Sequence, residues 1–215
     1  MKWTMAIVGF VAVTAAAPVF AQSNWTAEIS GGAAAPVGDI GSRLNTGWDF
    51  DFSGGYQFTD WLSLLGDFGF AGFGVPANIL QEFNAPVGHG RIVTLSLDPE
   101  VQFPVGHHLR GFVIGGAGWV HRAVELTAPS LQYVDIYDPV YGDLGPQPIA
   151  SDQVLSSVTR DALGENIGGG VSFPLVSLGA DLFAAVRYYR APTSPSMTTM
   201  MPITFGIRWT GRNKP

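Results

Sequence analysis

The sequence predicts an all-β protein, an eight-stranded antiparallel up-and-down transmembrane β-barrel. Three observations support this fold class: side chains alternate between apolar and polar in eight separate segments, the connections alternate between short and long, and charged residues are scarce. Only 13% of the 215 residues are charged, against roughly 25% in an average soluble domain. Cysteine is absent, which excludes a disulfide framework and cysteine-ligated metal sites.

Residues 1–21 have the pattern of a cleaved secretory signal peptide. Lys2 supplies a positive charge, an apolar run follows, and Ala21 ends a segment typical of a signal peptidase site. Thr14 and Pro18 interrupt the apolar run, which is therefore too short for a transmembrane helix. We expect residues 22–215 to form the mature barrel domain.

Eight segments show the two-residue period of a strand with one apolar and one polar face. The clearest is Trp48–Phe58, in which even positions are aromatic or glycine and odd positions are polar or small. Most segments have the length that a tilted strand needs to cross a bilayer, about 9–11 residues. In order they are Trp25–Ala33, Trp48–Phe58, Leu62–Phe73, Arg91–Phe103, Leu109–Glu125, Asp161–Phe173, Leu178–Arg190 and Thr199–Trp209.

The connections indicate which end of the barrel faces which side of the membrane. Short turns join segments two and three, four and five, and six and seven, whereas the other connections are mostly longer. This alternation and the even number of strands are typical of outer-membrane barrels, with the short turns in the periplasm. Aromatic residues at the segment ends predict two girdles at the membrane interfaces. The periplasmic girdle comprises Trp25, Phe58, Trp61, Phe103, Phe173 and Trp209, and the opposite one comprises Trp48, Phe73 and Tyr188.

The composition of the polar face decides whether it points inward or outward. A soluble, lipocalin-like barrel would show lysine and glutamate to water, but this face carries mostly short side chains and arginines. Such residues fit the narrow interior of an eight-stranded barrel, where arginine can pair with two carboxylates. We therefore predict an interior polar network of Glu28, Asp49, Asp51, Asp67, Asp98, Glu100, Arg110, Asp181, Arg187 and Arg208.

Two prolines and one long connection complete the prediction. Pro99 and Pro202 fall inside segments. Because proline removes a hydrogen bond of the ladder, we expect bulges there or strand ends displaced by a few residues. The connection from Leu126 to Arg160 is predicted to be a solvated extracellular loop. Its acidic and tyrosine side chains are candidates for binding calcium or a carbohydrate. These are Tyr133, Asp135, Tyr137, Asp138, Tyr141 and Asp143.

The last segment carries the most specific resemblance to a known family. Met201–Trp209 alternates strictly and ends in an aromatic residue. Over residues 22–209 the chain resembles the small outer-membrane β-barrels of Gram-negative bacteria, which include the transmembrane domain of outer-membrane protein A, outer-membrane protein X and the opacity proteins. The resemblance implies location in the outer membrane, contact with its lipid and lipopolysaccharide, and recognition of the last strand by the barrel-assembly machinery.

Three functions remain open at this stage. We expect a structural or surface-interaction role for a monomeric barrel without cofactor, metal or enzymatic activity. The excess of carboxylates in the interior leaves a narrow cation-preferring channel as an alternative. A third is a lipid-modifying enzyme that uses His89 or His121 with an acidic partner or a serine, of which Ser130 lies near His121 in the sequence. The net charge of −6 argues against nucleic-acid binding.

Overall fold

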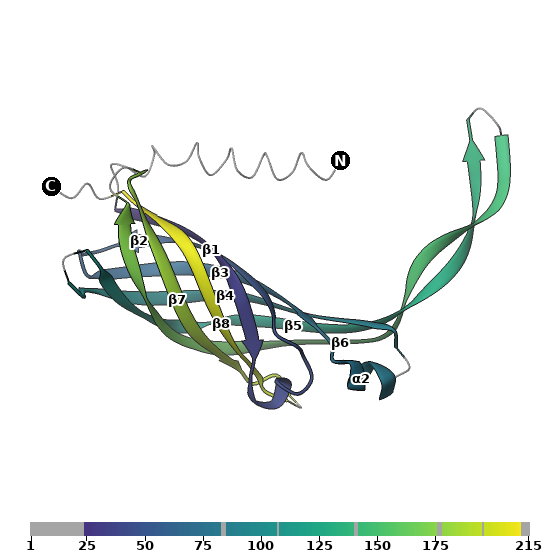
Figure 1. Ribbon diagram of the computed structural model, residues 1–215, viewed down its shortest axis with the longest axis horizontal. Helices are drawn as coiled ribbons and strands as arrows, with labels where there is room; N and C mark the ends of the chain where they lie inside the picture. Colours follow the sequence, from purple (N-terminus) through teal and green to yellow (C-terminus); the bar gives the residue numbers. More distant parts are fainter. Residues whose placement is uncertain are drawn as a thin grey trace.

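The computed structural model describes residues 24–82, 85–106, 108–139, 142–175, 178–194 and 196–211. In these residues the chain forms a closed barrel in which consecutive strands pair and the last strand pairs with the first (Figure 1). All the pairings are antiparallel. The predicted fold class is confirmed. The predicted signal peptide, residues 1–21, lies outside the described residues.

The strands begin and end close to the predicted segments, with two exceptions discussed below. Two short helical elements, η1 (Gly38–Ile40) and α2 (Ala77–Glu82), lie in connections. The strands are β1 (Trp25–Pro36), β2 (Gly47–Gln57), β3 (Leu62–Gly74), β4 (Val87–Pro104), β5 (Arg110–Asp138), β6 (Gly142–Leu175), β7 (Ala180–Ala191) and β8 (Thr198–Thr210). Among the described residues, no helix has the length and hydropathy needed to cross a bilayer.

The two ends of the barrel differ in their connections, as predicted. At one end β1 begins, β8 ends, and short turns link β2 to β3, β4 to β5 and β6 to β7. At the other end lie η1, α2, the β7–β8 connection and the joined ends of β5 and β6 (Figure 1). We refer to these as the short-turn end and the mouth.

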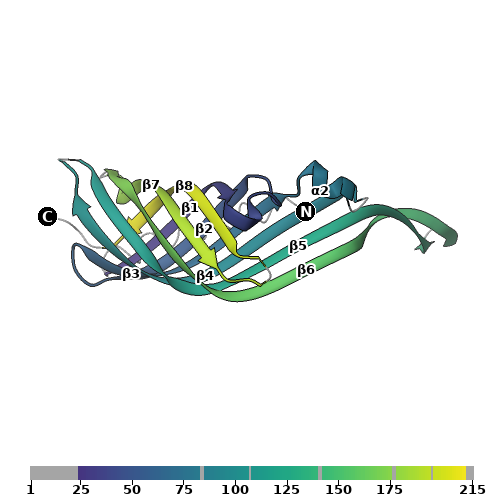
Figure 2. The ribbon, with the colours of Figure 1, turned by 90° about the horizontal axis from the view of Figure 1, so that it is seen from below.

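The prediction of a loop from Leu126 to Arg160 is wrong, because most of these residues extend strands β5 and β6. The two strands pair with each other as far as Asp138 and Gly142, while β4 leaves β5 at Thr127. Residues 128–138 and 142–153 thus form a two-stranded ribbon that projects beyond the barrel (Figures 1 and 2). Outside a bilayer, neither face of such a ribbon is required to be apolar. The sequence of the ribbon therefore lacks the strict alternation that identifies the barrel strands.

The expected bulges at Pro99 and Pro202 are also wrong. The pairing of β4 with β5 is interrupted between Leu97 and Glu100, yet it resumes in the same register. The pairing of β7 with β8 is likewise interrupted between Val186 and Tyr189, opposite Pro202, and resumes unchanged. Each proline therefore interrupts the ladder on one side of its strand without shifting the register. On the other side, the strand remains paired through the proline, β4 with β3 and β8 with β1.

Most polar side chains of the strands point into the barrel and most large apolar side chains point outward. In β2, Asp49, Asp51 and Ser53 are buried, whereas Phe50 and Phe52 are 43% and 52% exposed. The same parity orients β5, whose sequence is ambiguous: Phe112 and Ile114 are buried and Val113 is exposed. A continuous exposed apolar surface of this kind is atypical of soluble monomers. The soluble, lipocalin-like alternative, with its apolar face inward, is therefore wrong.

Candidate functional site

The lumen near the short-turn end is filled by an ion-paired group around Arg208. Arg208 lies opposite Glu28 in the β1–β8 ladder, and only 1% of its surface is exposed. Its Nε donates to Glu28 Oε1 at 2.6 Å, and its Nη2 donates to Glu100 Oε2 at 2.6 Å. Gln102 Nε2 donates to the other oxygen of Glu100 at 2.8 Å. One guanidinium thus joins β1, β4 and β8 across the lumen.

Two aromatic rings pack against the guanidinium of Arg208. The guanidinium carbon lies 4.9 Å from the ring centroid of Phe112 and 5.5 Å from that of Phe183. These rings form a buried apolar cluster with Leu65, Ile114 and Ala185. Because cation–π attraction is strongest away from water, the rings stabilise the buried charge while they fill the lumen.

A second ion-paired group lies farther toward the mouth, around Arg187 of β7. Its Nη1 is 3.1 Å from Asp67 Oδ2 and 3.3 Å from Asp98 Oδ2, and it donates to the Tyr189 hydroxyl at 3.0 Å. Ser53 donates to Asp67 at 2.6 Å, and Asn166 donates to Asp98 at 2.8 Å. Above this group the lumen is closed by a larger apolar cluster that includes Phe73, Ile92, Val120 and Met200.

Eight of the ten predicted network residues are buried, and four of the six buried carboxyl groups pair with the two arginines. Asp51 accepts a hydrogen bond from Ser30 at 3.3 Å, and Asp49 Oδ2 is buried without a hydrogen-bond partner in the described residues. Arg110 and Asp181 lie half-buried at the short-turn end and form no ion pair with a described residue. The sequence analysis missed Gln102 and Tyr189 as partners of the charged groups, although both have inward parity.

The predicted girdle residues lie on the outside of the barrel, except Phe73, which is 4% exposed and belongs to the apolar cluster inside the lumen. Trp25, Phe58, Trp61, Phe103 and Phe173 are exposed around the short-turn end, where Trp209 is half-exposed. Trp48 and Tyr188 are exposed nearer the mouth. Gly72 lets the Trp48 indole lie directly on β3, because a Cβ there would lie 2.7 Å from the ring. Exposed aromatic residues at both ends match the two interfaces of a bilayer.

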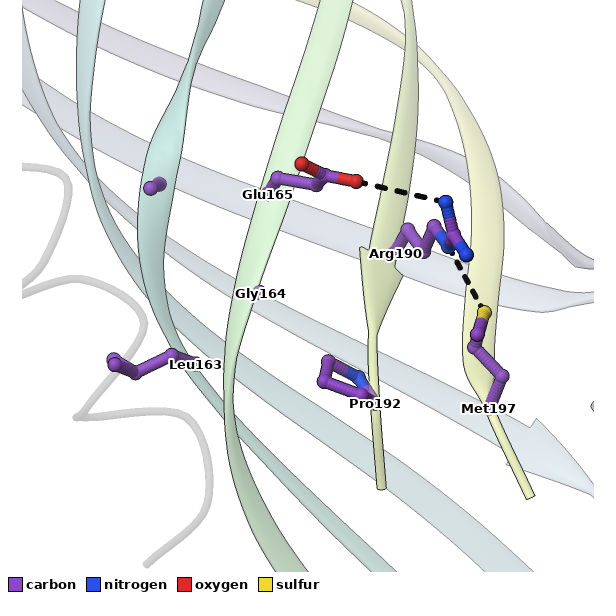
Figure 3. Close-up of a pocket in the computed structure, with 7 residues that line it drawn as sticks. Leu163, Gly164, Glu165, Arg190, Pro192 and Met197 are labelled. Carbon is purple, nitrogen blue, oxygen red and sulfur yellow. Dashed lines mark hydrogen bonds and ion pairs between the residues drawn. The ribbon is translucent and has the colours of Figure 1, made fainter. Parts of the chain in front are cut away.

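Outward-facing ion pairs mark the limit of the apolar band near the mouth. Glu165 faces outward on β6 and pairs with Arg190 of β7 at 3.8 Å, and Arg190 also contacts Met197 Sδ at 3.0 Å (Figure 3). These residues edge a hollow of about 430 Å³ above Gly164. A similar exposed pair, Arg91–Glu125, joins β4 and β5 at 3.3 Å.

Of the partners that the enzyme alternative names for a histidine, His121 meets an acidic side chain but not Ser130. His121 Nδ1 lies 2.8 Å from Asp161 Oδ1 on the outer surface, and its ring packs on Trp119 at 5.4 Å. Ser130 lies nine residues farther along β5, about 30 Å away at the rise of an extended strand, and donates to Ser151 O. His89 also lies on an outward-facing position of β4, opposite Glu125. Ser130 is therefore not brought to His121.

The predicted loop-binding residues lie on the ribbon rather than in a folded loop. Tyr133 and Asp135 are exposed on β5, and the backbones of Tyr137, Asp138 and Asp143 belong to the ends of β5 and β6. Tyr141 lies outside the described residues. The part of the chain that the structure describes contains no cluster of three or more side chains suited to a metal ion.

A concave feature that the sequence analysis missed lies at the mouth. We call it the mouth pocket; its volume is about 210 Å³. Its walls come from the η1 connection, the start of the β3–β4 connection with α2, the β7–β8 connection, and the inner faces of β5 and β6 just beyond the rim. Its polar lining residues are Arg43, Arg122, Ser156 and Ser196. No local sequence signal joins residues so far apart in the chain.

The apolar exterior, the aromatic girdles and the ion-paired lumen together define a transmembrane β-barrel. No protein-family model and no curated protein sequence matches the chain. Solved structures do match: the crystal structure of Neisserial surface protein A aligns with 87% of this chain and 97% of its own, at 15% identity and a TM-score of 0.57. A major outer membrane protein from Thermus thermophilus aligns with 86% and 98%, at 14% identity and a TM-score of 0.51. The chain has the fold of the small eight-stranded outer-membrane β-barrels, and a barrel of this fold belongs in a bacterial outer membrane.

Proposed function

We propose that the protein is a non-conducting barrel that reinforces the outer membrane and presents the ribbon and the mouth connections to the outside. The filled lumen is the observation that carries this proposal. Two ion-paired groups alternate with two apolar clusters along the barrel axis. Because a water-filled path needs a continuous polar interior, these apolar clusters favour a structural role over the cation-channel alternative.

The partners that we propose follow from the outer surface. The apolar band and girdles would contact lipid and lipopolysaccharide, with Arg190 and Arg91 near their headgroups. The barrel-assembly machinery would read β8, whose outward positions include Ile203 and Phe205, exposed by 45% and 66%. We propose that the barrel functions as a monomer, because all its strands pair within one chain.

Planar-bilayer recordings test whether the lumen conducts. We expect no discrete openings from the purified, folded protein over a wide range of voltage, because the buried apolar cluster with Phe112 and Phe183 packs beside Arg208 in the lumen. Folding and insertion are checked by the electrophoretic shift between unboiled and boiled samples. Reproducible cation-selective openings from the native protein would support the channel instead.

Cysteine labelling in intact cells tests which end is presented. The natural chain has no cysteine, so single substitutions can be read without background. Tyr133→Cys lies on the ribbon and Val105→Cys in a short turn, at positions where the native side chains are 69% and 50% exposed. A membrane-impermeant maleimide should label only Tyr133→Cys in intact cells and both variants after lysis. Labelling of Val105→Cys alone in intact cells would reverse the orientation and contradict the display role.

A further inference from the structure

The mouth pocket combines an apolar wall with an arginine that has no acidic partner among the described residues. Its apolar side is formed by Ile40, Leu44, Val75, Ile79, Val124 and Leu126. Arg122 extends from β5 on the same face as Val124 and Leu126. Only 6% of the Arg122 surface is exposed, so its guanidinium is held within the pocket wall rather than in solvent.

The hydrogen bonds of Arg122 are incomplete. Its Nη1 donates to Ser196 Oγ at 3.3 Å, while its Nε is buried without a partner in the described residues. A buried, unpaired donor on a charged group is costly, and native structures usually supply it with an acceptor. Arg122 is at the same time one of the residues that line the mouth pocket.

Two further arginines make the region positive. Arg43 lines the pocket, and Arg160 lies on β6 directly opposite Arg122 in the ladder. Both are close enough for their charges to act on Arg122. None of the three forms an ion pair with a carboxylate in the described chain: Arg160 instead donates to the carbonyl oxygens of Ser194 and Thr159. In a protein of net charge −6, three neighbouring arginines without acids indicate an anionic ligand.

The pocket volume limits the size of that ligand. At about 210 Å³, the pocket is smaller than the roughly 300–1,000 Å³ that is typical of sites for drug-sized ligands. Its volume therefore suits one short acyl chain better than a lipid with several chains. A carboxylate matches the fork of a guanidinium in a two-point hydrogen bond. A ligand with an apolar chain and one carboxylate therefore matches both the apolar side of the pocket and its arginines.

We propose that the mouth pocket binds a single-chain fatty-acid-type anion, with its carboxylate at Arg122 and Arg43 and its acyl chain against Leu44, Leu126 and Val158. This binding activity is additional to the envelope role and depends only on the fold. Ser156 and Ser196 lie at the pocket wall and offer further hydroxyl groups to the carboxylate.

Calorimetric titration of the full mature barrel in phosphatidylcholine nanodiscs tests this site, with octanoate as the probe. We expect saturable binding of octanoate and no saturable binding of octanol, acetate or octyltrimethylammonium. Empty nanodiscs correct for partition into lipid. Arg122→Gln and Arg43→Gln should each weaken octanoate binding by about tenfold or more, because each removes a charge-assisted hydrogen bond. Arg91→Gln, an exposed arginine outside the pocket that pairs with Glu125, is the matched control and should leave binding unchanged.

The same series contains results that would overturn the site. Octanol that binds as tightly as octanoate would mean that the arginines take no part. Equal binding by native protein, Arg43→Gln and Arg91→Gln would place any octanoate elsewhere. Arg43 lies in a connection between η1 and β2, so Arg43→Gln keeps the test decisive even if Arg122→Gln does not show the electrophoretic shift of a folded barrel.

Discussion

Replacing Arg208 by leucine is expected to lower the free energy of unfolding by about 3–5 kcal/mol, the typical cost of leaving buried charges without their partner. Arg208 is 1% exposed and holds both Glu28 and Glu100 at 2.6 Å. The variant would leave two buried carboxylates, 3% and 1% exposed, without the guanidinium that pairs with them. Urea titration in phospholipid vesicles, followed by tryptophan fluorescence, measures the change.

Two control variants separate loss of the ion pairs from loss of an arginine as such. Arg190→Leu removes an arginine that is half exposed and 3.8 Å from Glu165, and it should cost at most about 1 kcal/mol. Combining Arg208→Leu with Glu28→Gln and Glu100→Gln should recover much of the lost stability, because no unpaired charge remains. Equal losses for Arg208→Leu and Arg190→Leu would show that the buried group does not stabilise the barrel.

Replacing Leu97 by arginine is expected to cost about 2–4 kcal/mol, the range for a cationic residue at the middle of a lipid-facing barrel surface. Leu97 lies near the centre of the barrel part of β4, on its outward face, and is 64% exposed. The same urea titration in vesicles gives the magnitude. A soluble barrel would tolerate this change at an exposed position.

Leu131 provides a matched control because its exposure, 66%, is almost the same. It lies on the ribbon beyond the rim, where the side chain is expected to meet water. Leu131→Arg should therefore change stability by less than about 0.5 kcal/mol, as for most surface substitutions. A large effect of Leu131→Arg, or none of Leu97→Arg, would be inconsistent with a membrane boundary between the two residues.

The sequence predicts the parts of the fold in which the bilayer constrains both faces of a strand. In β2, Phe50 and Phe52 must meet lipid while Asp49 and Asp51 must avoid it, so alternation alone locates the strand and orients it. The interior position of Arg187 and Arg208 follows from the same parity. The ion-pair partners of these arginines cannot be predicted from parity. Arg208 meets Glu28 because of the register between β1 and β8, and it meets Glu100 because its side chain extends across the lumen to β4.

The features that sequence analysis misses lie where this constraint ends. Beyond Thr127 the backbone is satisfied by pairing between β5 and β6, which leaves little trace in side-chain order. At Pro99 and Pro202 the strand pairing is interrupted without a change of register. Whether the register is kept depends on pairing with the neighbouring strands, which is a tertiary interaction. The mouth pocket brings Arg43 to Arg122 through the closure of the barrel, and no spacing in the sequence encodes that proximity.

The ladder between β1 and β8 has a consequence for the order of folding. Every other ladder joins strands that are adjacent in the chain and can form as a local hairpin, whereas this seam joins Thr26 to Thr210. Contacts between residues so far apart form late, because the closure entropy of the intervening chain must be overcome first. The barrel cannot close until nearly the whole polypeptide has been synthesised and exported. Glu28 and Arg208, which face each other across the seam, therefore form their ion pair only at the final step of assembly.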